Sequence, residues 1–307
     1  MANPQRSLGA YTDLAQLASY RLAASRLQLT PQQRARYRQN GQWISQRRGR
    51  GMEFEDVRQY QSGDDIRSID WRVTARTDQA HTRQYREERE KPLLIVLDQR
   101  SSLFFGSRLA MKSVLAADLA AMLAWAGHGR GDRVGGLVIG NHHHQDIRPG
   151  QQRKSVMRLL QCISDYNQLL DASPCHTGQG WHDILAELQR ISRPGTQLFL
   201  ISDFHDLDEK ASAILHRLAK SCDITAIVVD DPLESELPAA GRYRAFNGRQ
   251  QLVFDSNPAN RQRYRNAYAA RRDALQQFFN RLRIPLVHAS TSDEPLTLLQ
   301  QLAGAIR

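Results

Sequence analysis

Short apolar runs that alternate with longer helical stretches are the feature that most constrains this fold. Each run is continuously apolar, as in a strand that is buried on both faces of a sheet. The runs cover residues 93–97, 134–139, 198–201, 224–229 and 286–287, and the helical stretches between them cover residues 109–125, 151–163, 181–191, 208–220 and 258–282. Strands and helices that alternate in this way build a mostly parallel sheet with helices on both faces. The sequence therefore predicts a doubly wound α/β domain over residues 92–307.

Two regions of different character precede this domain. Residues 1–45 contain leucines at helical spacing among arginines and glutamines, and they predict a helical N-terminal arm. Residues 46–91 are dense in acids, arginines and glycines, and they predict an irregular segment with short strands. This charged segment is expected to pack on the α/β domain.

A β-hairpin insertion is predicted late in the α/β domain. Residues 243–246 and 250–254 flank Asn247 and Gly248, a pair typical of the tight turn of a hairpin. Asn257 follows this hairpin and has a side chain suited to cap the start of the long helical stretch after it. The hairpin is therefore expected to be an elaboration of the domain and not part of its central sheet.

Charge is distributed unevenly along the chain, which carries 42 Lys and Arg against 32 Asp and Glu. Residues 1–92 carry a net charge of +6, residues 93–256 a net charge of −1, and residues 257–307 a net charge of +5. Basic ends attract nucleic acid, anionic lipid or an acidic protein, and composition alone does not choose among these partners.

No segment predicts a membrane span or an export signal. The most apolar long stretch, residues 115–126, includes Asp118 and is shorter than the ~20 residues that a spanning helix needs. The three cysteines, Cys162, Cys175 and Cys222, lie too far apart for a metal or redox motif. We therefore expect a cytoplasmic protein whose cysteines are reduced.

Carboxylates and hydroxyls follow two of the predicted strands. Asp98 comes directly after the first strand, Ser101 and Ser102 follow it on the next loop, and Asp203 comes after the third strand. Ligands of parallel sheets gather outside the carboxyl ends of the strands, so we expect these side chains to lie together. Their oxygens are the ligands that Mg²⁺ and Mn²⁺ prefer.

The order of these residues resembles the metal-ion-dependent adhesion site of von Willebrand factor A domains. That site combines an Asp-x-Ser-x-Ser motif with a threonine on a second loop and an aspartate on a third. Asp98, Ser102 and Asp203 match it, whereas Arg100 replaces the first serine, and Thr177 is only near the place of the threonine. A guanidinium at this position would hydrogen-bond to the carboxylates and repel a cation.

We therefore expect a degenerate site in which Arg100 lies within hydrogen-bonding distance of Asp98 or Asp203 and no cofactor binds. A Mg²⁺ site on Asp98, Ser102 and Asp203 is the alternative. In either case the carboxyl edge of the sheet, with Asp98, Arg100, Ser101, Ser102 and Asp203, is the predicted docking face for a partner protein.

A charged signature precedes the first predicted strand. It consists of Glu53, Phe54, Arg58, Tyr60, Gly63, Asp64, Asp65, Arg67, Asp70, Trp71 and Arg76. The interleaved acids and arginines favour a charge-paired loop, and Phe54, Tyr60, Ile69 and Trp71 are the expected apolar anchors. The signature resembles that of the domain of unknown function 58 (DUF58) family, and the similarity extends over roughly residues 45–255. This resemblance implies a von Willebrand factor A-like core and a MoxR-type AAA+ ATPase as partner in the assembly or maturation of other proteins.

Three functions are compatible with these features. The first is a protein-interaction scaffold without enzymatic activity, which needs no catalytic residue. The second is a nucleic-acid-binding protein that uses the basic terminal helices, for which no recognised motif is present. The third is a divalent-metal hydrolase centred on Asp98 and Asp203, which Arg100 argues against. The sequence favours the scaffold.

Overall fold

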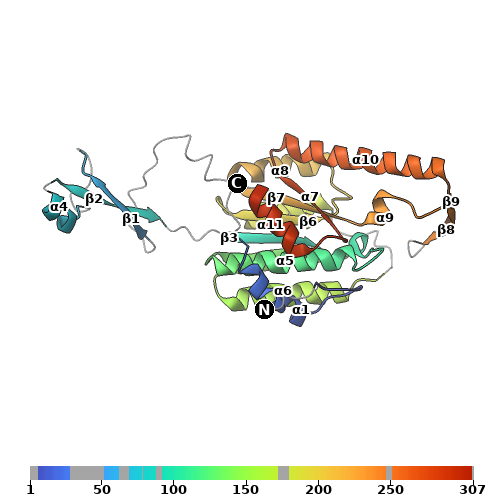
Figure 1. Ribbon diagram of the computed structural model, residues 1–307, viewed down its shortest axis with the longest axis horizontal. Helices are drawn as coiled ribbons and strands as arrows, with labels where there is room; N and C mark the ends of the chain where they lie inside the picture. The colour runs from blue at the N-terminus through green and yellow to red at the C-terminus, as the bar shows by residue number, and fades with distance from the viewer. Residues whose placement is uncertain are drawn as a thin grey trace. The chain divides into compact units, whose positions relative to one another are not determined.

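The computed structural model describes residues 6–27, 52–61, 69–77, 79–87, 92–171, 180–246 and 251–305. The chain divides into two units, of which the smaller is Arg38–Glu90 and the larger combines Met1–Tyr37 with Lys91–Arg307. Figure 1 shows the elements of both units.

A six-stranded sheet forms the centre of the larger unit, in the order β10-β7-β6-β3-β4-β5. The strands are β3 (Pro92–Asp98), β4 (Arg133–Ile139), β5 (His144–Gly150), β6 (Gln197–Ser202), β7 (Asp223–Asp230) and β10 (Leu286–Ser290). Adjacent strands are parallel except for β4 and β5. The predicted doubly wound, mostly parallel α/β fold is confirmed, and all five predicted strands are present.

Helices cover both faces of the sheet (Figure 1). One face is covered by α5 (Lys112–Gly129), α6 (Arg153–Gln168) and α11 (Pro295–Ala305), and the other by α7 (Trp181–Ile191), α8 (Glu209–Ser221) and α10 (Pro258–Arg281). Successive strand residues point to opposite faces, so Leu93 and Ile95 pack toward α5 whereas Leu94 and Val96 pack toward α7 and α8. This double burial explains the continuous apolar runs in the sequence.

The edge strand β5 was absent from the sequence prediction. It returns antiparallel to β4 after a short turn in which the Gly140 backbone N–H donates to the His143 carbonyl at 2.9 Å. Within β5 only Ile147 is buried, because the strand lies at the edge of the sheet and faces solvent on one side. A strand of this kind has no apolar run to reveal it.

The described part of the predicted N-terminal arm belongs to the core of the larger unit. It forms two short helices, α1 (Leu14–Ser19) and α2 (Arg21–Ala24), and Asp13 caps the first by accepting from the Gln16 backbone N–H. Leu17 and Tyr20 are fully buried among residues of α5 and α6. The Trp125 indole of α5 donates to the Leu17 carbonyl at 3.2 Å. The segment is thus packed structure and not a free arm.

The smaller unit is more regular than the sequence predicted. Two antiparallel strands, β1 (Met52–Gln59) and β2 (His81–Glu87), are joined in sequence through α4 (Trp71–Thr77). Asp70 starts this helix by accepting from the backbone N–H groups of Arg72 and Val73. The predicted strands are therefore present, whereas the expectation that the rest is irregular was wrong for residues 71–77, which form α4.

The predicted hairpin insertion is present as the antiparallel pair β8 (Gly241–Phe246) and β9 (Gln251–Ser256). Its turn lies outside the described residues. A one-turn helix, α9 (Pro232–Ser235), comes before the hairpin and is closed by a capping box between Asp231 and Glu234. The capping box brings Glu234 to the carboxyl end of β7.

Candidate functional site

Asp98 and Asp203 meet at the carboxyl edge of the sheet, as their positions after two strands predict. Asp98 ends β3, and Asp203 directly follows the neighbouring parallel strand β6. Asp98 is fully buried, and Asp203 is 7% exposed. Two carboxylates that are withdrawn from water need cations or hydrogen-bond donors close by.

Arg100 supplies the cation for Asp98. Its Nε lies 2.9 Å from Asp98 Oδ1 and its Nη2 lies 2.7 Å from Asp98 Oδ2, which is a bidentate pair. Although burial opposes the charge, the hydrogen bonds to Asp98 raise the pKa of Arg100 above its ordinary value. The expected contact between Arg100 and Asp98 is confirmed.

Arg100 also binds a carboxylate that the sequence did not single out. Its Nη1 and Nη2 donate to Asp206 at 2.7 and 2.9 Å. The Asp206 side chain is 42% exposed, whereas that of Arg100 is 12% exposed. The guanidinium therefore connects a buried carboxylate to one at the surface.

The oxygens of Asp98 are already occupied by donors, so the site does not fit a divalent cation. Oδ1 accepts from the backbone N–H and Nε of Arg100, and Oδ2 accepts from Nη2 of Arg100 and from the Ser202 hydroxyl at 2.7 Å. A carboxylate has about four lone-pair positions, and here four donors use them. A metal would have to displace Arg100, whose positive charge repels it.

Asp203 has a separate cation. The Lys112 ammonium lies 3.1 Å from Asp203 and 2.8 Å from Glu234, and the Lys112 side chain is 2% exposed. Burial opposes ionisation of Asp203, but the Lys112 ammonium outweighs it and holds the pKa of Asp203 below its ordinary value. Each of the two strand-end aspartates therefore has a different cationic partner.

The two predicted serines have different surroundings. Ser101 forms a reciprocal pair with Asn141, in which the Ser101 backbone N–H donates to Asn141 Oδ1 and Asn141 Nδ2 donates to the Ser101 hydroxyl. This pair joins the loop after β3 to the loop after β4. Ser102 is exposed at the surface of the site. Thr177 lies outside the described residues.

Aromatic side chains pack beneath the ion pairs. The Arg100 guanidinium carbon lies 6.0 Å from the centre of the buried Trp181 ring, and Trp181 packs on Phe204 at 5.2 Å between ring centres. Phe204 has a φ of 51°, a backbone conformation that residues with a side chain rarely adopt. Its backbone N–H donates to the Ser202 hydroxyl, which supports this turn after β6.

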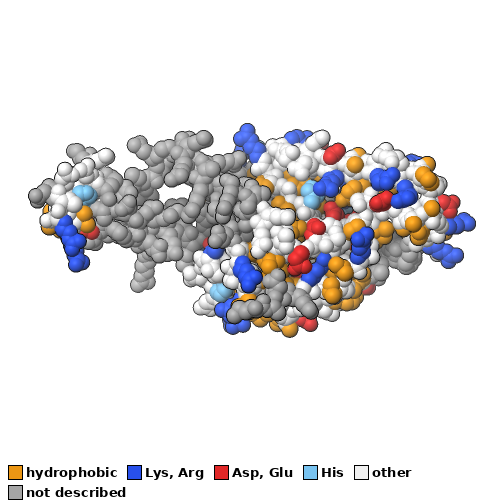
Figure 2. Space-filling model, viewed as in Figure 1, with side chains coloured by type: hydrophobic (Ala, Val, Ile, Leu, Met, Phe, Trp, Pro, Cys, Tyr) orange, Lys and Arg blue, Asp and Glu red, His pale blue; other side chains and the backbone are white. Residues whose placement is uncertain are grey.

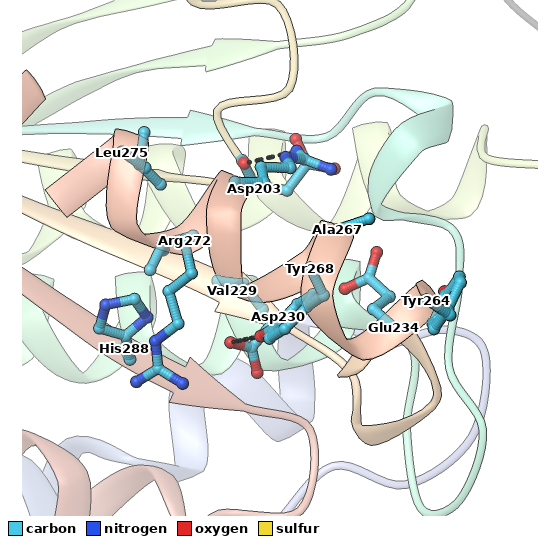
Figure 3. A pocket seen from close by; sticks show the side chains of 12 residues that line it. Asp203, Val229, Asp230, Glu234, Tyr264, Ala267, Tyr268, Arg272, Leu275 and His288 are labelled. Atoms are coloured by element: carbon cyan, nitrogen blue, oxygen red, sulfur yellow. Dashed lines mark hydrogen bonds between the residues drawn. The ribbon is translucent and has the colours of Figure 1, made fainter. Parts of the chain in front are cut away.

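A cavity of about 260 Å³ lies next to these ion pairs, between α10 and the ends of β7 and β10 (Figure 3). Asp203 and Glu234 line it together with Tyr264, Tyr268 and Asp230. The Tyr268 hydroxyl donates to Asp230 at 3.0 Å, and burial raises the pKa of Asp230. The cavity therefore extends from Asp203 and Glu234 toward α10, with polar and apolar side chains in its walls.

Several residues of the site were missed by the sequence reasoning. They are Lys112, Ser202, Asp206 and Glu234. Ser202 and Asp206 lie within three residues of the predicted Asp203, at and after the end of a predicted strand. Their position could therefore have indicated that they belong to the site. Lys112 and Glu234 had no such signal, because only the folded arrangement brings α5 and α9 to the same edge.

The signature residues belong to the smaller unit, whereas the strand-end aspartates belong to the larger one. Glu53, Phe54 and Arg58 lie on β1, Tyr60 follows it, and Asp70, Trp71 and Arg76 lie at or in α4. Gly63, Asp64, Asp65 and Arg67 lie outside the described residues. Trp71 is 67% exposed, so the unit itself does not bury this indole as an apolar anchor. The packing of the signature on the α/β domain stays a prediction.

The family model "Protein of unknown function DUF58" matches residues 56–275, which is most of the chain and includes both strand-end aspartates. The chain belongs to the DUF58 family. Curated relatives include the uncharacterized proteins Mb1516 of Mycobacterium bovis and Rv1480 of Mycobacterium tuberculosis. Each is 30% identical over 263 residues, which cover 84% of this chain and 81% of the relative.

Solved structures with a similar arrangement include the conserved hypothetical protein BatB from Bacteroides thetaiotaomicron. It is 16% identical with a TM-score of 0.42, and the match covers 70% of this chain and 98% of BatB. A von Willebrand factor type A protein from Catenulispora acidiphila is 12% identical with a TM-score of 0.35, over 74% of this DUF58 chain and 43% of that protein.

Among the residues that the structure describes, no helix is long and apolar enough to cross a membrane. In the same part of the chain, no three histidine, cysteine or acidic side chains are grouped so as to hold a metal ion.

Proposed function

We propose that this DUF58 protein is a non-enzymatic scaffold or adaptor of the cytoplasm that works with a MoxR-type AAA+ ATPase in the assembly or maturation of other proteins. The docking face is the carboxyl edge of the sheet around Asp98, Arg100, Ser101, Ser102 and Asp203. Membership of the DUF58 family and the α/β core are compatible with this function.

The observation that carries the proposal is the double contact of Arg100. The guanidinium holds buried Asp98 on one side and exposed Asp206 on the other, so the loops after β3 and β6 are joined without a metal. Ser101 and Asn141 join the loop after β4 to the same assembly. A rigid, charged surface of this kind loses little conformational entropy when a partner binds, and preorganisation favours affinity.

The same contacts support the absence of catalysis. A general base needs a carboxylate that is available to take a proton from a substrate. Here Arg100 and Ser202 donate hydrogen bonds to the Asp98 carboxylate, and Lys112 donates one to the Asp203 carboxylate. The hydrolase alternative would require a metal on Asp98, where the donors already present leave no position for it.

A direct binding experiment tests the scaffold proposal. The purified protein would be mixed with the MoxR-type ATPase of the same organism, with ATP, with ADP and without nucleotide, and complex formation would be measured by size-exclusion chromatography with light scattering. We expect a complex with the wild type and its loss with Asp206→Lys, which reverses the exposed charge of the docking face.

Asp273→Lys is the matched control, because it makes the same charge change on an exposed carboxylate of α10. Complex formation by this variant is expected to equal that of the wild type. Equal binding by Asp206→Lys and Asp273→Lys would contradict the proposed docking face. The absence of any complex in all three nucleotide conditions would contradict the proposed partner.

Nucleic-acid binding remains the alternative, and the basic helix α10 is its most suitable surface. Two of its arginines, Arg261 and Arg265, lie 2.6 and 3.3 Å from Glu236 and are therefore already paired. On the face drawn in Figure 2, Lys and Arg side chains of the larger unit are interspersed with Asp and Glu. Steep salt dependence of DNA or RNA affinity would favour this alternative over the scaffold.

A further inference from the structure

A second charged surface lies at the opposite, amino-terminal edge of the same sheet. It is a groove of about 400 Å³ beside the first residue of β3, Pro92, and the residues just before β6. Four arginines line it, namely Arg133, Arg148, Arg190 and Arg193, against one acidic residue, Asp146. The docking face at the carboxyl edge includes none of these residues.

The fold explains why these arginines gather. Arg133 begins β4, and the antiparallel return of β5 brings Arg148 to the same edge, since Gly150 at the end of β5 pairs with Val134. Arg190 lies in the last turn of α7, where the helix dipole favours a positive charge, and Arg193 follows on the loop to β6. The strand pair β4 and β5 and the end of α7, which are distant in sequence, therefore contribute positive charge to one groove.

Two of the four guanidiniums have their charge available for a ligand. Arg190 is paired with Glu187 at 2.6 Å, and Arg133 donates to the Pro149 carbonyl at 3.3 Å. Within the part of the chain that the structure describes, the guanidinium groups of Arg148 and Arg193 make no hydrogen bond or ion pair, and both side chains are exposed, although the charge of Arg148 acts on Asp146. The groove therefore presents unpaired cations, for which an anionic group is the complementary ligand.

The groove also has an apolar component. Pro92, Pro149 and Ile191 line it with partly exposed side chains, whereas Leu94 is buried. No aromatic side chain is among its described lining residues, whereas proteins that bind single-stranded nucleic acid stack bases on aromatic rings. Mixed apolar and cationic walls fit a peptide that carries both acidic and aliphatic side chains.

We propose that this groove binds an acidic, partly aliphatic peptide segment of a partner protein. Its carboxylates contact Arg148 and Arg193, and an aliphatic side chain lies on Ile191 and Pro149. The inference is independent of the proposed docking face, because the two surfaces lie at opposite ends of β3 and share no residue.

The test uses the full chain and a fluorescently labelled six-residue peptide in which glutamate and leucine alternate. Fluorescence anisotropy would measure its binding at about 0.15 M salt, where long-range charge attraction is screened. We expect saturable binding by the wild type and a loss of about tenfold in affinity, or 1.4 kcal/mol, for Arg148→Gln/Arg193→Gln. Both side chains are exposed, so we expect this variant to fold, and its melting temperature would confirm this.

Arg217→Gln/Arg263→Gln is the matched control, because it removes two exposed arginines from α8 and α10 and changes the net charge equally. We expect it to bind the peptide as the wild type does. Equal loss in both double variants would show nonspecific charge attraction and overturn the proposal. Stronger competition by an RNA oligonucleotide or by inorganic triphosphate than by unlabelled peptide would also overturn it, as would the absence of peptide binding.

Discussion

Lys112 Nζ lies 3.1 Å from Asp203 Oδ2, which makes a buried ion pair between the start of α5 and the end of β6. Together with the pair of Arg100 and Asp98, it gives each strand-end carboxylate its own cation. Glu234 adds a second acidic partner to Lys112. A buried charge that loses its partner strongly lowers the stability of the folded protein. Substitutions in these ion pairs are therefore expected to have measurable effects.

Asp98→Asn is expected to lower the free energy of unfolding by about 3 kcal/mol, because it removes the buried partner of Arg100. Asp206→Asn removes the exposed partner of the same guanidinium, and we expect it to cost less than about 1 kcal/mol. Urea unfolding of both variants measures the difference. Similar costs for the two substitutions would show that burial does not determine the strength of these contacts.

Metal affinity is expected to depend on both cations. Arg100→Ser restores the Asp-x-Ser-x-Ser spacing, but Lys112 still neutralises Asp203 in that variant. We therefore expect weak Mg²⁺ binding by Arg100→Ser and stronger binding by Arg100→Ser/Lys112→Met, with a melting temperature that rises with Mg²⁺ concentration. Titration calorimetry measures both variants and the wild type. Tight binding by the wild type would refute the replacement of the metal by Arg100.

Stability is expected to depend on pH through Asp118, a buried carboxylate of α5. Ser7 donates to it through its hydroxyl at 2.6 Å and its backbone N–H at 3.2 Å. Burial is the largest effect and raises the pKa of Asp118 to about 6, above its unfolded value of about 4.

Between these two values the native state holds a proton that the unfolded state has released. The free energy of unfolding should therefore fall as the pH rises from about 4 to about 6, by on the order of 2–3 kcal/mol, and then remain level. The difference between wild type and Asp118→Asn, measured by urea unfolding across this range, isolates this contribution from that of other carboxylates. A constant difference would contradict the assignment.

The predicted packing of residues 46–91 on the α/β domain is testable by limited proteolysis. If the signature packs there, trypsin should cleave this arginine-rich segment slowly in the native protein, although it offers many sites. Quenching of Trp71 fluorescence by acrylamide provides a second measurement. The smaller unit alone leaves this indole exposed, so packing on the α/β domain should reduce the quenching. Rapid cleavage between Gly51 and Lys91 would contradict the prediction.

The central sheet was predictable because its strands are buried on both faces. The run that became β3 is apolar at every position from Leu93 to Leu97, and each face meets a helix layer. The edge strand β5 has only Ile147 buried, so no apolar run marks it. In the smaller unit, β1 and β2 carry charges at many positions, so the sequence indicated short strands there without marking where they begin and end.

The candidate site was predictable in part. Asp98 and Asp203 follow strands of one parallel sheet, and this topology alone places them at a common edge. The spacing of Arg100 relative to Asp98 predicted their contact. Lys112 and Glu234 lie on helices whose positions depend on packing across the whole unit, so no local pattern pointed to their ion pairs.

The core of the larger unit is discontinuous in the chain, since residues 6–27 and 92–305 share it while the unit of residues 38–90 comes between them. During synthesis Leu17 and Tyr20 therefore leave the ribosome long before α5 and α6, which bury them, have been made. The nascent chain carries these apolar side chains uncovered until translation has passed Gln168, the last residue of α6. This interval is when a chaperone would have the most apolar surface of the N-terminal helices to bind.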